Sequence, residues 1–323
     1  MDFLTIAGAN LTSPMVLCFV LGVGAALLRS ELSIPEAAAK MMSLYLLFAI
    51  GFKGGAEVAR HGLGPDIAFA VLAGIALSAL LPVIAYLLMR VATGLSGVDA
   101  AAVAAHYGSI SIVTFVAATQ ALEGAGLVHD GYMVAVAAAM EAPAIIVGLF
   151  LASRHLGKSD RSTGELGREI LLNGSIVLLV GAFVIGWISG DTGFRTIAGL
   201  IDTPFKGVLC LFLLDMGLLA GRHLRGSAGK LGPATLAVGL YMPLVGASVA
   251  LPIGLLIGLS PGSLALLLTL AASGSYIAAP AALRIALPQA NPAIYLTLSL
   301  GVTFPFNLTL GVPIYIAVAE ALA

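Results

Sequence analysis

The chain has 323 residues, of which 60% are hydrophobic and 10% charged, and its formal net charge at pH 7 is −1. Soluble domains carry roughly 25% charged residues, so this composition excludes an ordinary water-facing protein. The near-zero net charge also gives no sign of a nucleic-acid partner.

About ten apolar blocks, each close to the roughly 20 residues that a bilayer-spanning helix needs, follow one another along the chain. The first five are Leu11–Leu28, Pro35–Gly51, Pro65–Met89, Gly97–Leu122 and Tyr132–Ser153. The second five are Ile170–Ser189, Ile201–Ala220, Pro233–Leu259, Gly262–Leu287 and Ala293–Val318. They predict an all-α polytopic membrane protein. The first block has no basic segment ahead of it, so we expect a span there and not a cleaved signal peptide.

Residues 154–169 form a polar linker that divides the chain into residues 1–153 and 170–323, with five spans each. The halves share features at matching places: Gly51 and Gly55 correspond to Gly217 and Gly221, and Gly108-Ser109 corresponds to Gly274-Ser275. Because five is an odd number, the second half is predicted to lie upside down relative to the first. Inverted repeats of this kind recur in secondary transporters, which bind substrate where the repeats meet.

The distribution of basic residues predicts the orientation, because Lys and Arg favour cytoplasmic loops. With the N-terminus outside, 11 of the 15 Lys and Arg residues lie on the cytoplasmic side, whereas Lys53, Arg60, Arg195 and Lys206 lie outside. Both termini are therefore predicted on the outer face of the cell inner membrane.

Spans four and nine each contain a Gly-Ser pair near their middle, and span nine adds Pro280. In a helix interior glycine costs about 1 kcal/mol and proline about 3 kcal/mol relative to alanine. Since unpaired backbone groups are costly in hydrocarbon, a broken helix is tolerated only inside protein or beside a cavity. Two breaks at matching places predict one central site, although small residues in membrane helices can also serve only close packing.

The predicted cargo of this site is a small anion. Half-helices that begin near Ile110 and Ile277 would offer free backbone N–H groups, which favour negative charge. Neighbouring hydroxyl groups add donors, and the lack of Lys and Arg within the breaks suits a singly charged anion. The predicted anion-binding residues are Gly108, Ser109, Ile110, Ser111, Ser273, Gly274, Ser275 and Tyr276.

Glu141 in span five and Asn307 in span ten predict a neighbouring sodium site. Carboxylate and amide oxygens are hard ligands, and a carboxylate inside a membrane is costly and marks a functional site by default. The predicted sodium ligands are Ser109, Thr114, Glu141, Ser275 and Asn307. Two alternatives remain open at this point: a protonated Glu141 that only bonds a neighbouring helix, and proton coupling through the same residue.

Other polar residues are interpreted as structural. His106 is expected to be a hydrogen-bonded packing group, and Asp215 to pair with Arg222 or reach the interface. Asp99, together with Ser96, is expected to cap the start of span four.

The sequence lacks a phosphate-binding glycine loop with a lysine, a helical pair of metal-binding histidines and a nucleophile elbow. The chain is therefore predicted to be neither an enzyme nor an ATP-driven pump, with no organic cofactor. A channel remains an alternative, but it would need a continuous hydrated path, and no ring of charged residues is found.

The chain resembles the sodium-dependent bicarbonate transporter family over nearly its whole length. The similarity is most specific in three strings of the second half, at Ser275–Arg284, Ala286–Tyr295 and Phe304–Asn307. The first of these reads Ser-Tyr-Ile-Ala-Ala-Pro-Ala-Ala-Leu-Arg. At the first break the chain departs from the family pattern, because His106 and Tyr107 crowd it and Ile110 separates the two serines.

The resemblance implies a homotrimer that takes up bicarbonate with sodium by an elevator-like movement. Spans 3–5 and 8–10 would form the mobile core, and spans 1, 2, 6 and 7 would form the scaffold. Bicarbonate would lie between the two breaks, with sodium beside it near Glu141 and Asn307. It also implies that a small PII-like regulator can bind on the cytoplasmic side. Another small monovalent anion or a carboxylate, driven by sodium or protons, stays an alternative substrate.

Overall fold

The computed structural model describes residues 3–62, 64–156, 174–227 and 231–323, and over these residues it contains helices and no strand. The predicted all-α class is thus confirmed. The predicted linker, residues 154–169, lies outside the described residues from residue 157 onward.

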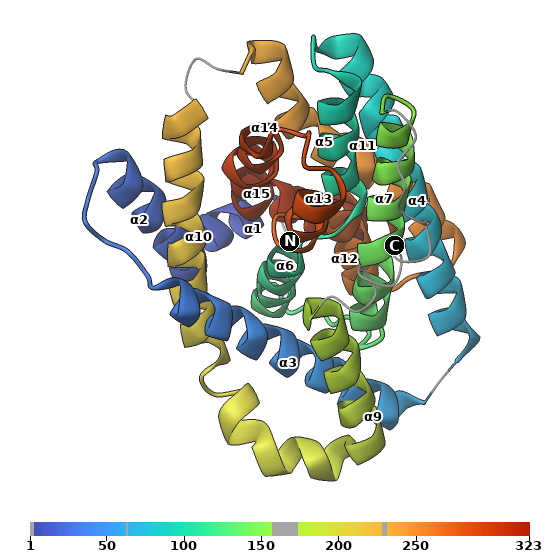
Figure 1. Ribbon diagram of the computed structural model, residues 1–323. Helices are drawn as coiled ribbons and strands as arrows, with labels where there is room; N and C mark the ends of the chain where they lie inside the picture. The colour runs from blue at the N-terminus through green and yellow to red at the C-terminus, as the bar shows by residue number, and fades with distance from the viewer. Residues whose placement is uncertain (1–2, 63, 157–173, 228–230) are drawn as a thin grey trace.

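Helices of both halves alternate in space, with α5 and α6 of the first half beside α12 and α13 of the second at the centre (Figure 1). In the first half they are α1 (Phe3–Leu11), α2 (Pro14–Leu27), α3 (Glu36–His61), α4 (Pro65–Ala92), α5 (Gly97–Gly108), α6 (Ile112–Gly124) and α7 (Met133–Ser153). In the second half they are α9 (Gly174–Ile201), α10 (Phe205–Ser227), α11 (Pro233–Leu256), α12 (Pro261–Ala272) and α13 (Ala278–Ala286). The last span consists of α14 (Pro292–Leu296), η1 (Thr297–Thr303), α15 (Phe304–Phe306), η2 (Asn307–Gly311) and α16 (Val312–Leu322), with η1 and η2 π-helical.

Eight helical stretches among the described residues are long and apolar enough to cross a membrane, against about ten expected from the sequence. The difference lies at α2 and α12, which have only 14 and 12 residues. The first predicted block divides because a new helix begins at Pro14: the Ser13 hydroxyl accepts the Val16 N–H at 3.3 Å, and proline suits the first helical position. The length of α2 therefore falls short of a full span.

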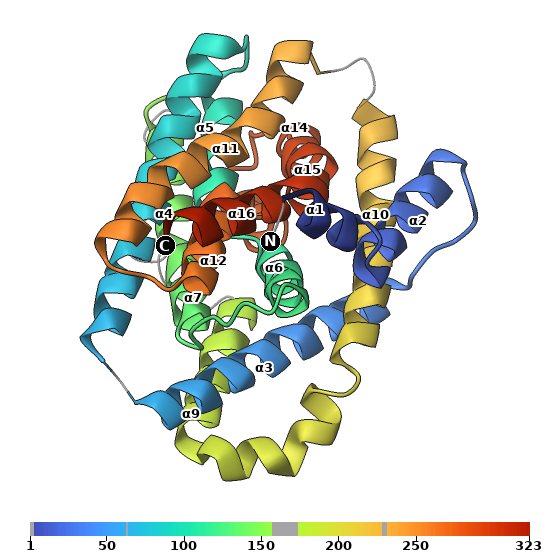
Figure 2. The same cartoon turned by 180° about the vertical axis from the view of Figure 1, so that it is seen from behind.

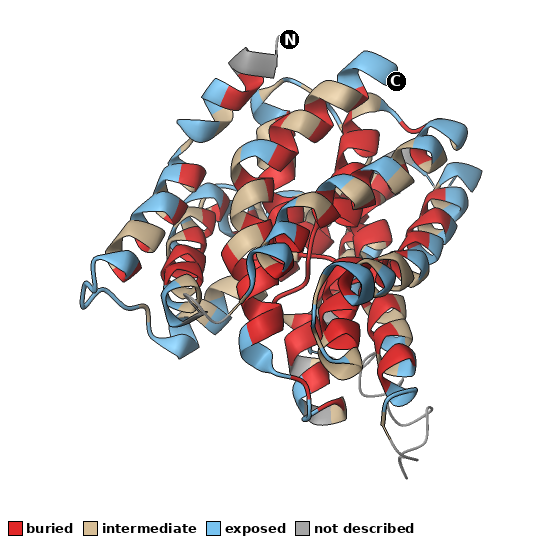
Figure 3. Cartoon of the chain, turned by 90° about the horizontal axis from the view of Figure 1, so that it is seen from above, coloured by how far each residue is buried: buried red, intermediate tan, exposed pale blue. Residues whose placement is uncertain are grey.

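Helices α5, α6 and α12 lie at the centre of the molecule. In the stretch Gly97–Gly124, 94% of the most apolar 18 residues are buried. Every residue of α12 from Gly262 to Ala272 is also buried. Figure 3 shows this concentration of buried residues in the central helices. A helix that is apolar on all sides and also buried on all sides is enclosed by protein, so these helices face other helices and not lipid.

Two helix pairs, α2 with α10 and α3 with α9, lie to one side of these central helices in both views (Figures 1 and 2). Glycines bring each pair into backbone contact. A Cβ atom on Gly51 would lie 2.5 Å from the Leu179 carbonyl oxygen, and one on Gly221 would lie 2.7 Å from the Ala26 Cβ. Only glycine permits so close an approach at these two places.

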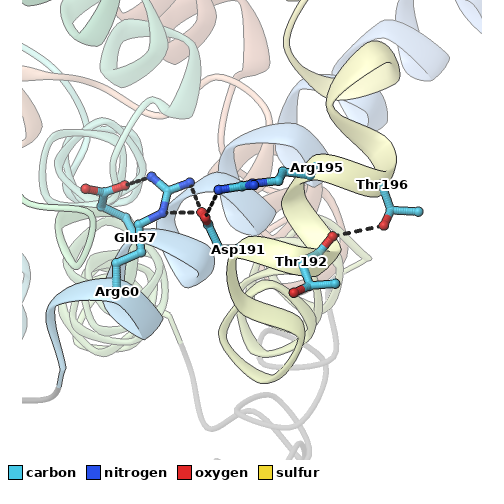
Figure 4. A network of polar contacts seen from close by, with 6 residues as sticks. All are labelled: Glu57, Arg60, Asp191, Thr192, Arg195 and Thr196. Carbon is cyan, nitrogen blue, oxygen red and sulfur yellow. Dashed lines mark hydrogen bonds and ion pairs between the residues drawn. The ribbon is translucent and has the colours of Figure 1, made fainter.

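Helix α9 bends at Gly190, whose φ of 55° and ψ of −147° are open to glycine and strained for other residues. Polar contacts hold the bend against α3 (Figure 4). The Arg60 Nε lies 2.6 Å from an Asp191 carboxylate oxygen, and Arg195 approaches the other oxygen of that carboxylate at 3.0 Å. The predicted sixth span thus ends where expected, but the helix continues past the bend to Ile201.

Candidate functional site

Residues 109–111 are extended and separate α5 from α6 in the interior of the protein. Ser109 and Ser111 both have β-region backbone angles. The Ser111 hydroxyl caps α6 by accepting the Thr114 N–H at 3.2 Å, and it also accepts the Thr114 hydroxyl at 2.9 Å. The helix start expected near Ile110 is therefore at Ile112.

Residues 273–277 separate α12 from α13 in the same way, with α13 beginning at Ala278. The Ser275 hydroxyl accepts the Ala279 N–H at 3.1 Å. The Ser273 hydroxyl donates to the Leu270 carbonyl oxygen at 2.8 Å, which satisfies one of the carbonyls at the end of α12.

The two extended segments are bonded to each other. The Ser111 N–H donates to the Ser273 hydroxyl at 2.9 Å. The Ser275 N–H donates to the carbonyl oxygens of His106 at 2.8 Å and Ser109 at 3.1 Å. All four serines are at most 3% exposed. Backbone groups that leave their helices here therefore find partners across the junction, as a buried interruption requires.

A small cavity lies against these segments. Its wall consists of Leu47, Ile110, Ser111, Ile112, Ala138, Glu141, Leu179, Ser275, Tyr276, Ile277 and Ala278. The space open to the centre of a water-sized sphere is about 20 Å³. Since about 10–15 Å³ measured in this way holds one water molecule, the cavity suits a single small ion or molecule.

Two hydroxyl groups at the junction are buried with few partners: the Oγ of Ser109 has none among the described residues, and the Oη of Tyr276 has none beyond an interaction with Ser111. Buried polar groups are nearly always paired, so an unpaired one calls for an explanation. Tyr276 also lines the cavity. Both groups are therefore donors that a ligand at the junction could use.

Glu141 supplies the carboxylate in the cavity wall, and it is 8% exposed. It lies in a turn of α7 opened by Pro143. The Ser78 hydroxyl of α4 enters this turn, donating to the Met140 carbonyl oxygen at 2.5 Å and accepting the Ala144 N–H at 3.1 Å. The sequence reasoning did not single out Ser78. Among the described residues no basic side chain forms an ion pair with Glu141, so a bound cation would be its natural counterion.

Asn307 is fully buried and lies at the start of η2. Its Nδ2 donates to the Ala272 carbonyl oxygen at 2.8 Å, and its Oδ1 accepts the Tyr315 hydroxyl at 2.9 Å. Neither Asn307 nor Thr114 is part of the cavity wall. The structure thus brings Glu141, Ser111, Ser275 and Tyr276 together at the cavity, and places Asn307 behind the end of α12.

The two glycines of the predicted anion site differ in surroundings. A Cβ on Gly108 would lie 2.5 Å from the Pro82 ring and 2.7 Å from the Ala144 Cβ. A Cβ on Gly274 would come no closer than 3.5 Å to Ser299. Gly108 is therefore required for packing, whereas Gly274 has room around it.

His106 makes the packing contacts expected of it, while its Nε2 is buried without a hydrogen-bond partner among the described residues. Its Nδ1 lies 2.7 Å from the Ala102 carbonyl oxygen, and its ring stacks on Tyr295 with centroids 4.5 Å apart. The next residue, Tyr107, was expected only to crowd the break, and its hydrogen bond was not predicted. Its hydroxyl lies 2.8 Å from the Thr303 hydroxyl, which donates to the Gly239 carbonyl oxygen at 2.7 Å.

The predicted cap of α5 is also found: the Ser96 hydroxyl accepts the Asp99 N–H at 3.0 Å. Asp99 has a further role that the sequence did not reveal, because it accepts the Asn291 N–H at 2.8 Å and so ties α5 to the loop before the last span.

Comparison with known proteins gives a family but no individual relative, since no curated protein matches the chain. A family model matches residues 14–320, which is nearly the whole chain and includes both junction segments and Glu141. The chain is therefore a multi-pass membrane protein of a transporter family, and it belongs to the Na+-dependent bicarbonate transporter superfamily.

Proposed function

We propose that the protein is a secondary active transporter that couples the uptake of bicarbonate to sodium. One observation carries the proposal: the hydroxyl groups of Ser111, Ser275 and Tyr276 meet the Glu141 carboxylate, which has no basic partner among the described residues, at a small buried cavity. Family membership supports the same pair of ions. Bicarbonate is small, carries one charge and both donates and accepts hydrogen bonds. It therefore suits a site of neutral donors better than a site rich in arginine.

The anion binds, in this proposal, between the extended segments, at the residues expected from the sequence. Helices α6 and α13 both begin there, so their first N–H groups and the positive ends of their dipoles face negative charge. The hydroxyl groups of Ser111, Ser275 and Tyr276, which line the cavity, and those of Ser109 and Ser273 would supply donors, and Gly108, Ile110 and Gly274 would supply backbone between them.

Sodium binds beside the anion, with Glu141 as its charged ligand. Further oxygen ligands would come from Ser109, Thr114, Ser275 and Asn307. A carboxylate, a sodium ion and bicarbonate together carry one net negative charge, whereas the carboxylate and the anion alone would repel each other in a medium of low dielectric constant. Sodium therefore makes anion binding next to Glu141 favourable, which is the physical basis of coupling.

Two pairs of matching contacts between the halves of the chain support inverted repeats. Helix α2 of the first half packs on α10, and α3 packs on α9 of the second half, as expected if corresponding helices swap places. The corresponding glycines Gly51 and Gly217 both face a carbonyl oxygen of the other half, in Leu179 and Phe19. The starts of α5 and α12 are likewise each bound by the opposite half.

The second pair of matching contacts joins the start of a central helix in each half to a loop of the other half. Asp99 at the start of α5 accepts the Asn291 N–H, and Ser263 at the start of α12 both accepts the Asp130 N–H at 2.9 Å and donates to the Asp130 carboxylate at 2.6 Å. We propose that α4–α7 and α11–α16 form a core that moves like an elevator, against a scaffold of α2, α3, α9 and α10. Assembly as a homotrimer, termini on the outer face of the inner membrane and docking of a PII-like regulator are further proposals that rest on the family.

A route to the site runs along α3. This helix contributes Leu47 to the central cavity and Lys53 and Glu57 to a larger cavity of about 300 Å³ between α3, α6 and α7. The larger cavity lies toward the end of α6 that the positions of basic residues assign to the outer face. We propose that it is the entrance from outside.

Uptake of labelled bicarbonate into proteoliposomes, with and without an inward sodium gradient at constant pH, tests the function. We expect uptake only with the gradient, and its loss in Glu141→Gln. The matched control is Asp191→Asn, which removes a carboxylate paired with Arg60 and Arg195 at the exposed bend of α9, away from both cavities. Wild-type protein that takes up no bicarbonate would reject the substrate, and other small monovalent anions and a proton gradient would then be tried. A flux that saturates with substrate concentration identifies a carrier, whereas resolvable single-channel currents would identify a channel.

A further inference from the structure

The last span touches the ends of both interrupted helices. It opens into the π-helical segments η1 and η2 on either side of Pro305, and π-helical turns are frequent at functional sites. Three of its buried polar residues recur at four-residue spacing, namely Ser299, Thr303 and Asn307. Ser299 lies beside Gly274, Thr303 bonds Tyr107 near the end of α5, and Asn307 bonds Ala272 at the end of α12. This face of the span therefore fixes the positions of both helix ends.

Asn307 is held on both sides by contacts that leave it one orientation. The Ala272 carbonyl oxygen can only accept, so the amide nitrogen of Asn307 must face it, and the amide oxygen then faces the Tyr315 hydroxyl. Ala272 is the last residue of α12, so its carbonyl has no partner within the helix. Asn307 supplies that partner, and Tyr315 fixes Asn307 while leaving its oxygen a second lone pair.

Gly311 leaves room for the relay, namely the two hydrogen bonds that link Tyr315, Asn307 and the Ala272 carbonyl. A Cβ on Gly311 would lie 2.5 Å from the Asn307 Oδ1 and 3.0 Å from the Tyr315 Oη. Tyr315 and Asn307 are 1% and 0% exposed, so water cannot replace either bond. Two buried polar side chains, a glycine that gives them room and a free helix-end carbonyl thus form one connected unit.

We propose that Tyr315 is a positioning residue of the ion site: through Asn307 it holds the carbonyl end of α12, and with it the extended segment 273–277. This inference rests on the proposed function for its transport consequence, but its structural part stands independently. Without the Tyr315 hydroxyl, Asn307 keeps only its bond to the Ala272 carbonyl and its amide oxygen is left unpaired, so the segment that carries Ser273 and Ser275 is held less firmly. Sodium and bicarbonate then bind more weakly, while the loaded core moves at its usual rate.

The variant Tyr315→Phe tests the proposal, because it removes one hydroxyl group and keeps the buried ring. We expect the sodium concentration for half-maximal uptake to rise about three- to tenfold, as the loss of one buried hydrogen bond allows, with the maximal rate within about twofold of wild type. Gly311→Ala, which obstructs the relay from the other side, should shift the same quantity in the same direction. The matched control is Tyr45→Phe, which removes a hydroxyl that donates to the Leu200 carbonyl oxygen at 2.6 Å in the scaffold, and it should change neither quantity.

Backbone hydrogen exchange in the purified protein separates this inference from the proposed function. In Tyr315→Phe we expect faster exchange in peptides covering residues 273–279, and unchanged exchange in peptides from α3 and α9. Unchanged exchange at residues 273–279, or an unchanged half-saturating sodium concentration in a transporting protein, would overturn the positioning role. Faster exchange in a protein whose wild type shows no sodium-dependent uptake would keep the positioning role and reject the transport proposal.

Discussion

The two interrupted segments share a Gly-Ser pair but are built differently. The first has three residues between helices, and Ser111 caps the helix that follows. The second has five, and Ile277 before α13 provides no side-chain cap. Gly108 is packed tightly between Pro82 and Ala144, whereas Gly274 has room for a methyl group in ordinary contact with Ser299 and Tyr107. The first segment is thus held rigidly by the helices around it. The second depends for its position also on the last span, through Ser299 and Asn307.

Residues at matching places in the two halves, such as Gly108 and Gly274, therefore need not serve the same physical purpose. The glycine of the first segment is needed because neighbouring helices leave no room for a methyl group. The glycine of the second is not needed for packing, and its φ does not lie in the left-handed region. A methyl group therefore fits at Gly274 but not at Gly108, and four substitutions can test the contrast.

The largest effect is expected for Gly108→Ala. The new methyl group would meet the rigid Pro82 ring at 2.5 Å and the Ala144 Cβ at 2.7 Å. Overpacking of this kind typically costs about 1–3 kcal/mol, and we expect the upper end because proline cannot yield by rotation. Thermal unfolding of the purified protein should show a clearly lower midpoint. A midpoint equal to that of wild type would mean that α4 and α7 separate easily, and the first segment would not be held rigidly.

Ser273→Ala should come next, since this hydroxyl joins the two segments. Its loss leaves the buried Ser111 N–H without a partner, at a cost of about 1–3 kcal/mol. The matched control is Ser248→Ala, whose hydroxyl only donates to the Leu244 carbonyl oxygen on the exposed side of α11. Equal unfolding midpoints for the two variants would show that the bond between the segments contributes nothing.

Ser111→Ala removes the cap of α6 and is expected to destabilise the protein by about 1 kcal/mol. Ser96→Ala removes the corresponding cap of α5 at the far end of that helix, and it should cost a similar amount. The two variants should differ in transport: uptake falls with Ser111→Ala and stays near wild type with Ser96→Ala once corrected for folded protein. Equal uptake in both would remove Ser111 from the anion site.

The smallest change in stability, of opposite sign, is expected for Gly274→Ala. Alanine fits the backbone and the space there, so the substitution should stabilise the protein by about 0.4–1 kcal/mol through the unfolded chain. Uptake should nevertheless fall, because the methyl group points between Ser299 and Tyr107. Destabilisation as large as that of Gly108→Ala would make the two segments equivalent and end the contrast.

Much of this architecture could be predicted from the sequence, because hydropathy, glycine and proline act locally. The helix starts expected near Ile110 and Ile277 are at Ile112 and Ala278 in the structure. Glu141 could be singled out because a carboxylate in an apolar block is costly wherever it lies. The start of α2 carried a usable signal, since Ser13 before Pro14 is a common beginning for a helix.

The remaining features depend on contacts between distant residues. Ser78 reaches the opened turn of α7 only because α4 packs there, and its position in the sequence gives no sign of this. Tyr107 and Thr303 are 196 positions apart. The π-helical turns that direct Thr303 and Asn307 toward the junction result from this packing, so neither the relay through Tyr315 nor the face of the last span could be predicted.

The glycine contacts between α2 and α10 and between α3 and α9 have a consequence for biogenesis. Each of these helices finds its backbone partner in the half of the chain that is made at another time. When the first half has entered the membrane, Gly51 and Gly55 face lipid, which cannot fill the grooves they leave. The newly inserted first half is therefore expected to remain loosely associated until α9 and α10 emerge from the ribosome. Close packing of this protein is then a late step that follows insertion, and a chain stopped before α9 would be a natural substrate for membrane quality control.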